Sequence, residues 1–278
     1  MECWICMTVW AAAMIVFLKL FFGRRGSKEI IKKDWQKDTV YLYQFPRLPT
    51  IPNISPFCLK VETFLKANNI NYEVCPVLAR RSQYGYVPFV ELNGEHIADS
   101  QVIIHQLSKH FDVKRHPVLP QDEAIARAVD RMVDTHTFFV LRHFVVVENA
   151  VEFCSLILRN MNFPASLISI AASVLSFCMK RKVINRIAAG VGLMSTDDYK
   201  EILKKDYDAL KTLLGEQKFL FGDSISTVDC TVFGHLATIF YIPTASYAKD
   251  LLKEEYPSLV AYLERVKETV YGKDFASE

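Results

Sequence analysis

The amino-acid sequence predicts three parts: a transmembrane helix within residues 1–25, an α/β domain over residues 38–112 and an all-helical domain over residues 121–270. Three observations support this fold class. Short β-rich runs alternate with helical patterns in the first half, helical spacing of apolar residues dominates the second half, and the amino terminus is strongly apolar. A chain of 278 residues is long enough for two modest domains and an appendage.

The amino-terminal apolar run extends from Cys3 to Phe22 and contains one charged residue, Lys19. Its length is close to the roughly 20 residues that a helix needs to cross the hydrocarbon core of a bilayer. The basic residues follow this run, whereas a cleaved signal peptide begins with them; they are Arg24, Arg25, Lys28, Lys32 and Lys33. This charge order favours an uncleaved anchor with the body of the protein in the cytosol. The alternatives are a cleaved signal and a buried helix of a soluble protein.

The α/β domain is expected to contain four strands and two helices. The first helix begins at Ser55, where a serine cap precedes a proline at the first helical position, and it ends near a pair of asparagines. Asn93-Gly94 is a strong hairpin signal between the last two strands. Asp99 or Ser100 is expected to cap the second helix. The strands are expected at 40–45, 71–77, 87–92 and 96–98.

The all-helical domain is predicted from apolar residues at helical spacing. One run, 163–179, is apolar enough to suggest a second membrane span, but it contains four serines and is marginal in length, so a buried or membrane-apposed helix is favoured. Ser226 and Asp229 have the spacing of a capping box at the start of an apolar helix. Asp229 is therefore interpreted as a folding residue and not as a catalytic one.

Composition argues against several classes of function. Lysines and arginines number 33 against 31 aspartates and glutamates, so there is no global basic surplus of the kind that indicates nucleic-acid binding. The seven cysteines are odd in number and scattered, which is unlike a disulfide framework. No set of histidines, cysteines and carboxylates has the spacing of a metal site. The sequence therefore predicts no nucleic-acid partner and no bound metal.

Three short motifs resemble the amino-terminal, thioredoxin-like domain of glutathione transferases. They are Ser55-Pro56-Phe57-Cys58 at the start of the first helix, Val87-Pro88 at the third strand, and Asp99-Ser100 at the start of the next helix. The phrase FLFGDSISTVDCTVFG in the second half resembles the carboxyl-terminal domain of the same family. The resemblance covers about residues 38–270 and implies a glutathione transferase-like architecture.

This resemblance implies that glutathione is the cosubstrate and that Ser55 and Cys58 are the catalytic candidates. In the family, the position of Ser55 donates a hydrogen bond to the glutathione sulfur or is a cysteine that forms a mixed disulfide. The positive end of a helix stabilises a thiolate at that point. Cys58 stands where thioredoxin-like proteins often keep a resolving cysteine. The alternative roles are a helix cap for Ser55 and a small buried apolar residue for Cys58.

Four further residues are expected, by resemblance, to bind glutathione. The family has a cis-proline at the position of Pro88, and the backbone of Val87 would pair with the cysteinyl part of glutathione. Asp99 and Ser100 would hold its glutamyl carboxylate with a helix N-terminus and a hydroxyl. The alternatives are a purely structural proline and another helix cap. Tyr86 departs from the family, which often has lysine or glutamine before the Val-Pro pair.

The amino-terminal run and the first-helix motif together resemble one branch of the superfamily. This branch holds the failed-axon-connections proteins, the nematode cadmium-responsive proteins and, more distantly, the metaxins. The resemblance implies a stress-defence protein of an intracellular membrane, such as the lysosomal one, that uses glutathione against cadmium, another toxic metal or an electrophile. It would act as a glutathione-dependent transferase or reductase, and a homodimer is compatible with the family. The main alternative is a non-catalytic adaptor at an intracellular membrane. A third hypothesis is cadmium sequestration by Cys58 and Cys75.

Overall fold

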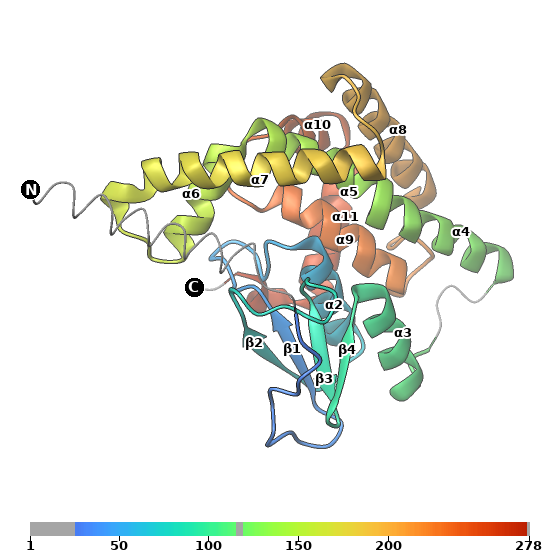
Figure 1. The fold of residues 1–278 in the computed structure, drawn as a ribbon. Helices are drawn as coiled ribbons and strands as arrows, with labels where there is room; N and C mark the ends of the chain where they lie inside the picture. The colour runs from blue at the N-terminus through green and yellow to red at the C-terminus, as the bar shows by residue number, and fades with distance from the viewer. Residues whose placement is uncertain (1–25, 115–118, 277–278) are drawn as a thin grey trace, which may run out of the picture.

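The computed structural model describes residues 26–114 and 119–276. The first half contains a four-stranded sheet in the order β2-β1-β3-β4. The strands are β1 (Val40–Gln44), β2 (Tyr72–Pro76), β3 (Phe89–Leu92) and β4 (Glu95–Ala98). β1 pairs parallel with β2 and antiparallel with β3, and β4 pairs antiparallel with β3. Each strand falls where the sequence predicts one, in a thioredoxin-like arrangement at one end of the molecule (Figure 1).

Two helices complete the α/β part. α2 (Pro56–Ala67) starts with proline at its first position and ends at Asn68, and α3 (Ser100–His110) starts directly after Asp99. Apolar side chains of both helices pack with those of the sheet in one core, to which Val61, Ile103 and Val90 belong. The helix starts agree with the predicted positions, and the Asp99 side chain caps α3, but the Ser55 side chain makes no capping hydrogen bond at the start of α2.

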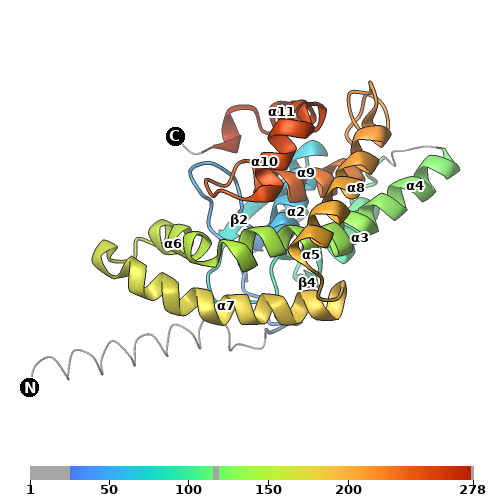
Figure 2. The ribbon, with the colours of Figure 1, turned by 90° about the horizontal axis from the view of Figure 1, so that it is seen from above.

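The second half is helical, as predicted. Its helices are α4 (Pro120–Arg131), α5 (Phe138–Arg142), α6 (Ala150–Asn160), α7 (Ile168–Gly190), α8 (Thr196–Leu214), α9 (Thr227–Phe240), α10 (Tyr247–Glu255) and α11 (Pro257–Val270). Two π-helical segments, Met132–Thr137 and His143–Glu148, follow α4 and α5 and continue their helical path. Seen from above, the long α7 runs along one side of the molecule past α6 and α5 (Figure 2).

The predicted capping box at the start of α9 is confirmed. The Ser226 hydroxyl accepts from the Asp229 backbone N–H, and the Asp229 carboxylate accepts from the Ser226 backbone N–H at 2.8 Å. The same carboxylate accepts from the Leu220 N–H at 3.0 Å and from the Tyr262 hydroxyl at 2.9 Å. Asp229 is fully buried, so these bonds stabilise a polar group that would otherwise be costly to bury. Asp229 therefore organises the fold, as interpreted from its spacing.

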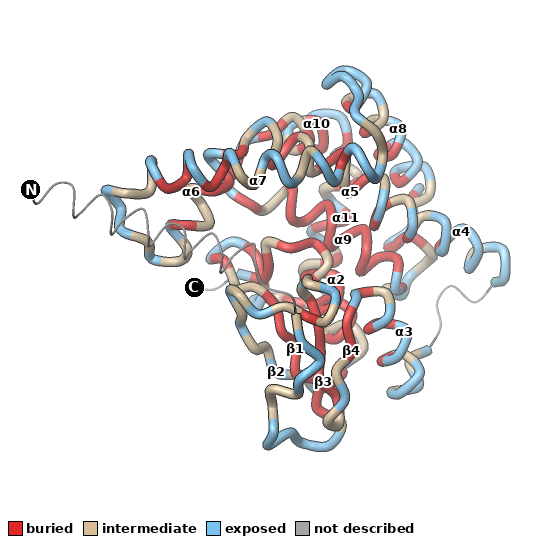
Figure 3. The backbone as a smooth tube through the Cα atoms, viewed as in Figure 1, coloured by how far each residue is buried: buried red, intermediate tan, exposed pale blue. Residues whose placement is uncertain are grey.

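α2 and α9 cross at close range and join the two halves. A Cβ atom placed on Gly234 would lie 2.7 Å from the Pro56 carbonyl oxygen and 3.0 Å from the Lys60 nitrogen. Only glycine allows the two backbones to approach this closely. Leu59 of α2 consequently belongs to the core of the helical half. Figure 3 shows the continuous buried region where α2, α9 and α11 meet.

The structure corrects the prediction of a membrane-spanning helix. Across residues 26–114 and 119–276, no helix is both long enough and apolar enough to cross a bilayer. The segment predicted as the anchor, residues 1–25, lies outside the described residues.

The apolar run at 163–179 does not form a second span either. Pro164 precedes a short 3-10 turn, and α7 begins only at Ile168. One side of α7 is buried, with Ala172 and Leu175 packed in a core that also contains Leu158 of α6. Burial against α6 accounts for the apolar residues on one side of α7 only, since Ile170 and Phe177 on the same stretch are exposed.

Candidate functional site

A cavity of about 300 Å³ lies between the α/β part and helices α5, α6 and α7. The α/β part contributes Ser55, Val87 and the loop that contains Tyr86. The helical part contributes mainly apolar side chains, such as Phe138 and Phe153. An apolar concave surface with a few polar groups is the usual form of a small-molecule site. Ser55 and Val87, which the sequence predicts as site residues, therefore meet at one cavity.

Ser55 lies at the N-terminus of α2 but does not use its side chain to cap the helix. Its carbonyl accepts from the Leu59 N–H at 3.0 Å, and its own N–H donates to the Asn53 side chain at 3.0 Å. Its side chain makes no capping hydrogen bond. The residue is only 7% exposed and lines the cavity. Its hydroxyl therefore does not cap the helix, and the residue lies at the cavity wall close to the positive end of α2.

Val87 precedes a cis peptide bond to Pro88, as the sequence predicts. The ladder between β1 and β3 begins with the pair Tyr43 and Phe89, so Val87 lies beyond its end. Within the described chain, no hydrogen bond occupies the Val87 N–H or carbonyl. An extended ligand lying in the cavity would find both groups open for strand-like pairing.

Asp99 and Ser100 lie outside the lining of the cavity. Asp99 has a φ of 77° and caps α3, with its carboxylate accepting from the Gln101 N–H at 3.0 Å and from the Val102 N–H at 3.2 Å. Ser100 is buried as the first residue of α3. The structure therefore does not bring this pair into the cavity that contains Ser55 and Val87.

Cys58 is fully buried beneath the start of α2. Burial raises the pKa of its thiol to about 12, and an interaction with Ser55 offsets only part of this effect. A thiol with such a pKa is protonated near neutral pH, and the thiolate is the nucleophilic form. This environment matches the alternative of a small buried apolar residue.

Four basic side chains line the cavity, and the sequence prediction did not identify them as a group. They are Arg81, Arg142, Lys182 and Arg186. Arg142 interrupts an apolar stretch of α5, and this charge within an apolar run was the one signal available in the sequence. The other three come from a loop and from α7. Only the folded chain shows that they share a cavity.

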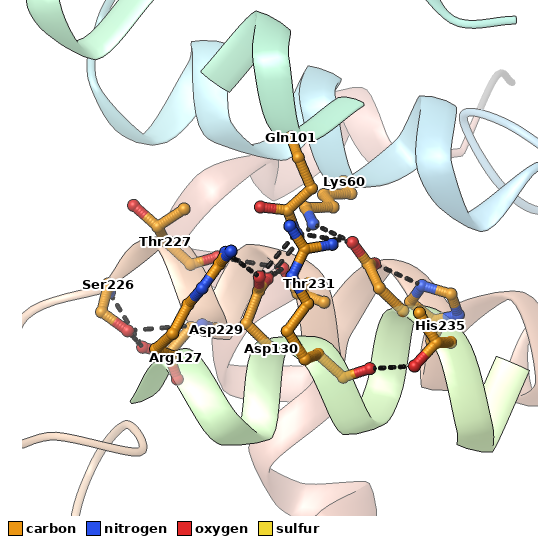
Figure 4. A network of polar contacts seen from close by, with 12 residues as sticks. Lys60, Gln101, Arg127, Asp130, Ser226, Thr227, Asp229, Thr231 and His235 are labelled. Carbon is orange, nitrogen blue, oxygen red and sulfur yellow. Dashed lines mark hydrogen bonds and ion pairs between the residues drawn. The ribbon is translucent and has the colours of Figure 1, made fainter. Parts of the chain in front are cut away.

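A buried polar network lies where α2, α4 and α9 meet (Figure 4), and none of the residues in it lines the cavity. The Lys60 ammonium group lies 2.6 Å from an Asp134 oxygen and 3.2 Å from an Asp130 oxygen. The Thr231 hydroxyl donates to Asp130 at 2.6 Å, and His235 Nε2 lies 3.0 Å from the second Asp134 oxygen. The network therefore connects α2 and α9 with α4 and with the π-helical segment that follows α4.

The ionisable groups of this network shift one another. Burial raises the pKa of the Asp134 carboxyl, but the hydrogen bond with His235 and the Lys60 charge outweigh burial and hold it well below its usual range. Burial lowers the pKa of His235, and Asp134 compensates only in part. The arrangement favours an ionised Asp134 with a neutral His235. None of these residues lines the cavity beside Ser55, and their contacts between α2, α4 and α9 fasten the two halves together.

No group of three or more histidines, cysteines and carboxylates with the geometry of a metal site occurs in the part of the chain that the structure describes. Cys58 is buried in the start of α2, while Cys75 lies in β2 and is partly exposed. The hypothesis of cadmium sequestration by these two cysteines gains no support from this arrangement.

Two family models match the sequence. The Glutathione S-transferase N-terminal domain matches residues 56–151, and the Glutathione S-transferase C-terminal domain matches residues 203–266.

Curated relatives and solved structures agree with these models. Failed axon connections of Drosophila melanogaster is 31% identical over 255 residues, which cover 86% of this chain and 60% of that protein, so the chain spans three fifths of the relative's length. The isoprene-epoxide–glutathione S-transferase of a Rhodococcus species is 24% identical, and the match covers 78% of this chain and 93% of that protein. A metaxin-2 homologue of Caenorhabditis elegans is also 24% identical, and the match covers 66% of this chain and 80% of that protein. The β-etherase LigF of a Sphingobium species superimposes with a TM-score of 0.56 at 17% identity, covering 82% of this chain and 94% of its own, which shows a common fold.

Proposed function

Because this chain belongs to the glutathione S-transferase family, in the branch of Failed axon connections and the metaxins, we propose that it binds glutathione beside Ser55 and transfers it to a small electrophile. The observation that carries the proposal is the Ser55 side chain, which lines the cavity at the N-terminus of α2 and does not cap the helix. A hydroxyl donor next to unpaired helix N–H groups stabilises a thiolate.

In this proposal the chain's own groups orient glutathione. The Ser55 hydroxyl donates a hydrogen bond to the glutathione sulfur and lowers the pKa of its thiol by favouring the thiolate. The open N–H and carbonyl of Val87 pair with the cysteinyl backbone, and Pro88 keeps that residue at the end of the sheet. Asp99 and Ser100 at the start of α3 receive the glutamyl end, which would extend beyond the cavity lining.

The proposed reaction is a substitution at an electrophilic carbon. The thiolate sulfur forms a bond to this carbon, the leaving group departs with the bonding electron pair, and the thiol proton passes to solvent. Phenylalanines of α5 and α6 surround the second substrate and exclude water from the reacting atoms. Cys58 takes no part in the proposed reaction, because it is buried and its pKa is raised to about 12. This favours transferase chemistry over a reductase that uses a mixed disulfide with the protein.

A second candidate is a non-catalytic adaptor, and one observation favours it. The Asp99 carboxylate already accepts the N–H groups of Gln101 and Val102 at the start of α3. It therefore adds negative charge at the place where a glutamyl carboxylate would bind. The similarity to a metaxin-2 homologue agrees with this alternative at the level of the family.

A role in defence against cadmium or another toxic metal is part of the proposal only through glutathione. Among the described residues there is no cluster of metal ligands, and the proposal assigns such a role to glutathione conjugation or glutathione binding.

The test is calorimetric titration of the full chain with glutathione. We expect a Kd in the micromolar to millimolar range for the wild type and a loss of affinity in Ser100→Ala. Ser166→Ala, which changes an exposed serine outside the cavity, is the matched control. Turnover is then followed with an aryl chloride whose conjugate absorbs light, and Ser55→Ala should lower kcat by a factor of about 100 through loss of the donor to the thiolate. A folded protein that binds no glutathione would leave the adaptor as the function.

A further inference from the structure

Three arginines line the cavity beside Ser55, and none of the described aspartates or glutamates does. They are Arg81, Arg142 and Arg186. No ion pair joins Arg81, Arg142 or Arg186 to a carboxylate anywhere in the described chain. Buried or partly buried charges are normally paired, because removing them from water is costly. An anion bound in the cavity would supply the missing partner.

Arg142 is the strongest indication. Its guanidinium carbon lies 5.3 Å from the Phe138 ring centre and 6.0 Å from the Phe153 ring centre, so its contacts are aromatic. Burial and, to a smaller extent, the charge of Arg186 together lower the pKa of Arg142 to about 10. Two arginines thus repel one another across an apolar space. A guanidinium in this setting favours a ligand that accepts two parallel hydrogen bonds, as a carboxylate does.

Arg186 faces the cavity from α7 and is held by a neutral partner. Its guanidinium donates to the Tyr86 hydroxyl at 3.0 Å and lies 5.0 Å from the centre of the Tyr86 ring. Tyr86 thereby orients Arg186 without neutralising it. The residue that departs from the family pattern, immediately before Val87, therefore serves to position a cation of the helical half.

Apart from Asn160 and Lys182, the remaining wall of the helical half is apolar. Phe138, Phe139 and Ile157 line it from α5 and α6, and Met179 and Val183 line it from α7. A ligand that fills this space must combine an apolar body with one negatively charged end.

We propose that the helical side of the cavity binds an amphiphilic carboxylate, with its charged end on Arg142 and Arg186 and its apolar body against the phenylalanines of α5. The role of this carboxylate as the second substrate rests on the proposed function. Its binding to the cavity does not require glutathione.

Glutathione itself has carboxylates, so its position must be separated from that of the proposed ligand. Ser55 and Val87, its expected partners, belong to the α/β part, whereas Arg142 and Arg186 belong to the helical part. The two ligands would therefore occupy opposite walls of one cavity.

The test uses three probes that share an eight-carbon chain and differ in charge: octanoate, 1-octanol and octylammonium. Each is titrated by calorimetry into the full chain without glutathione. We expect octanoate to bind at least about tenfold more tightly than 1-octanol, since a paired guanidinium adds a charge-assisted hydrogen bond, and octylammonium to bind most weakly. Arg142→Met and Arg186→Gln should each weaken octanoate about tenfold or more and leave 1-octanol unchanged.

Arg159→Met on α6 and Arg181→Gln on α7 are the matched controls, because both arginines are exposed and lie outside the cavity lining. Equal affinity for the three probes, no binding of octanoate, or unchanged octanoate affinity in both cavity variants would each overturn the proposal. Cavity variants that weaken glutathione binding and leave octanoate binding unchanged would also overturn the proposal. Octanoate binding in a protein that does not bind glutathione would support this inference while the transferase proposal fails.

Discussion

The ammonium nitrogen of Lys60 lies 2.6 Å from a carboxylate oxygen of Asp134, and the two side chains are only 1% and 5% exposed. Lys60 belongs to α2 of the α/β part, and Asp134 belongs to the helical segment after α4. The pair therefore fixes the position of one half against the other. Since the cavity is formed between the same two halves, its shape depends on this contact.

Asp134→Asn should destabilise the protein strongly. The substitution leaves the Lys60 charge with a weaker set of partners in a buried place, and loss of one partner from a buried pair costs about 3–5 kcal/mol. The measurement is the free energy of unfolding in urea. Asp197→Asn, which removes the partner of the exposed Lys200, should leave that free energy nearly unchanged. Similar free energies of unfolding for both variants would show that the buried Lys60 pair stabilises the fold no more than the exposed Lys200 pair does.

The same network predicts acid sensitivity through His235. The folded pKa of His235 is lowered by burial and by the charges of Lys60 and Arg142, against the opposing effect of Asp134. A histidine with a lowered folded pKa stabilises the fold above its unfolded pKa, and this contribution is lost as the pH falls toward the folded pKa.

The free energy of unfolding should therefore fall as the pH decreases below about 6.5, with at most about 1.4 kcal/mol per pH unit from this one group. His235→Gln should reduce the slope in this range. Asp134, whose folded pKa is also lowered, contributes in the same direction at more acidic pH, below its unfolded value. If the unfolding free energies of the wild type and of His235→Gln change equally with pH between about 5 and 6.5, groups other than His235 cause the acid sensitivity.

The fold was predictable from sequence because its signals are local. Asn93-Gly94, the proline after Ser55 and the Ser226 to Asp229 spacing each act within a few residues, and the observed turn and helix starts follow them. The network was not predictable, because Lys60 and Asp134 are 74 positions apart and pair only through the crossing of the two halves.

The candidate site was predictable in part. Ser55 and Val87 meet at the cavity, since the start of α2 and the residue before Pro88 lie side by side in this sheet topology. The cavity arginines were not identified as a group from the sequence, because they come from a loop, from α5 and from α7 and share a cavity only in the folded chain. Hydropathy likewise cannot separate a helix that buries one face, as α7 does, from a helix that spans a bilayer.

Ser55 and Ser226 offer a matched pair of helix-start serines with opposite expected effects. Ser226→Ala should cost about 1–2 kcal/mol of unfolding free energy, because its hydroxyl caps α9 and contacts the buried Asp229. Ser55→Ala should change stability by no more than about 0.5 kcal/mol, because its side chain makes no capping bond. Urea unfolding of both variants is the measurement. A loss at Ser55 as large as that at Ser226 would indicate a structural role for Ser55.

The cysteines should differ sharply in reactivity. Burial raises the pKa of Cys58 and of Cys154 to about 12, and Cys230 is buried as well. Cys75 and Cys178 are partly exposed. While the protein is folded, alkylation with iodoacetamide at pH 8, followed by mass spectrometry, should label the partly exposed Cys75 and Cys178. It should not label the buried Cys58, Cys154 and Cys230. The same reaction in urea, where all five are accessible, is the control. Rapid labelling of native Cys58 would reopen its role as a nucleophile.

Gly234 tests how closely α2 and α9 must approach. A Cβ atom at this position would lie 2.7 Å from the Pro56 carbonyl oxygen, which is backbone and cannot rotate away. Gly234→Ala should therefore separate the two helices and cost about 1–3 kcal/mol, despite the better helix propensity of alanine. Because Pro56 directly follows Ser55, the same shift would displace the Ser55 hydroxyl and weaken glutathione binding. Urea unfolding and calorimetry on the one variant measure both effects, and an unchanged protein would mean that the crossing tolerates a wider spacing.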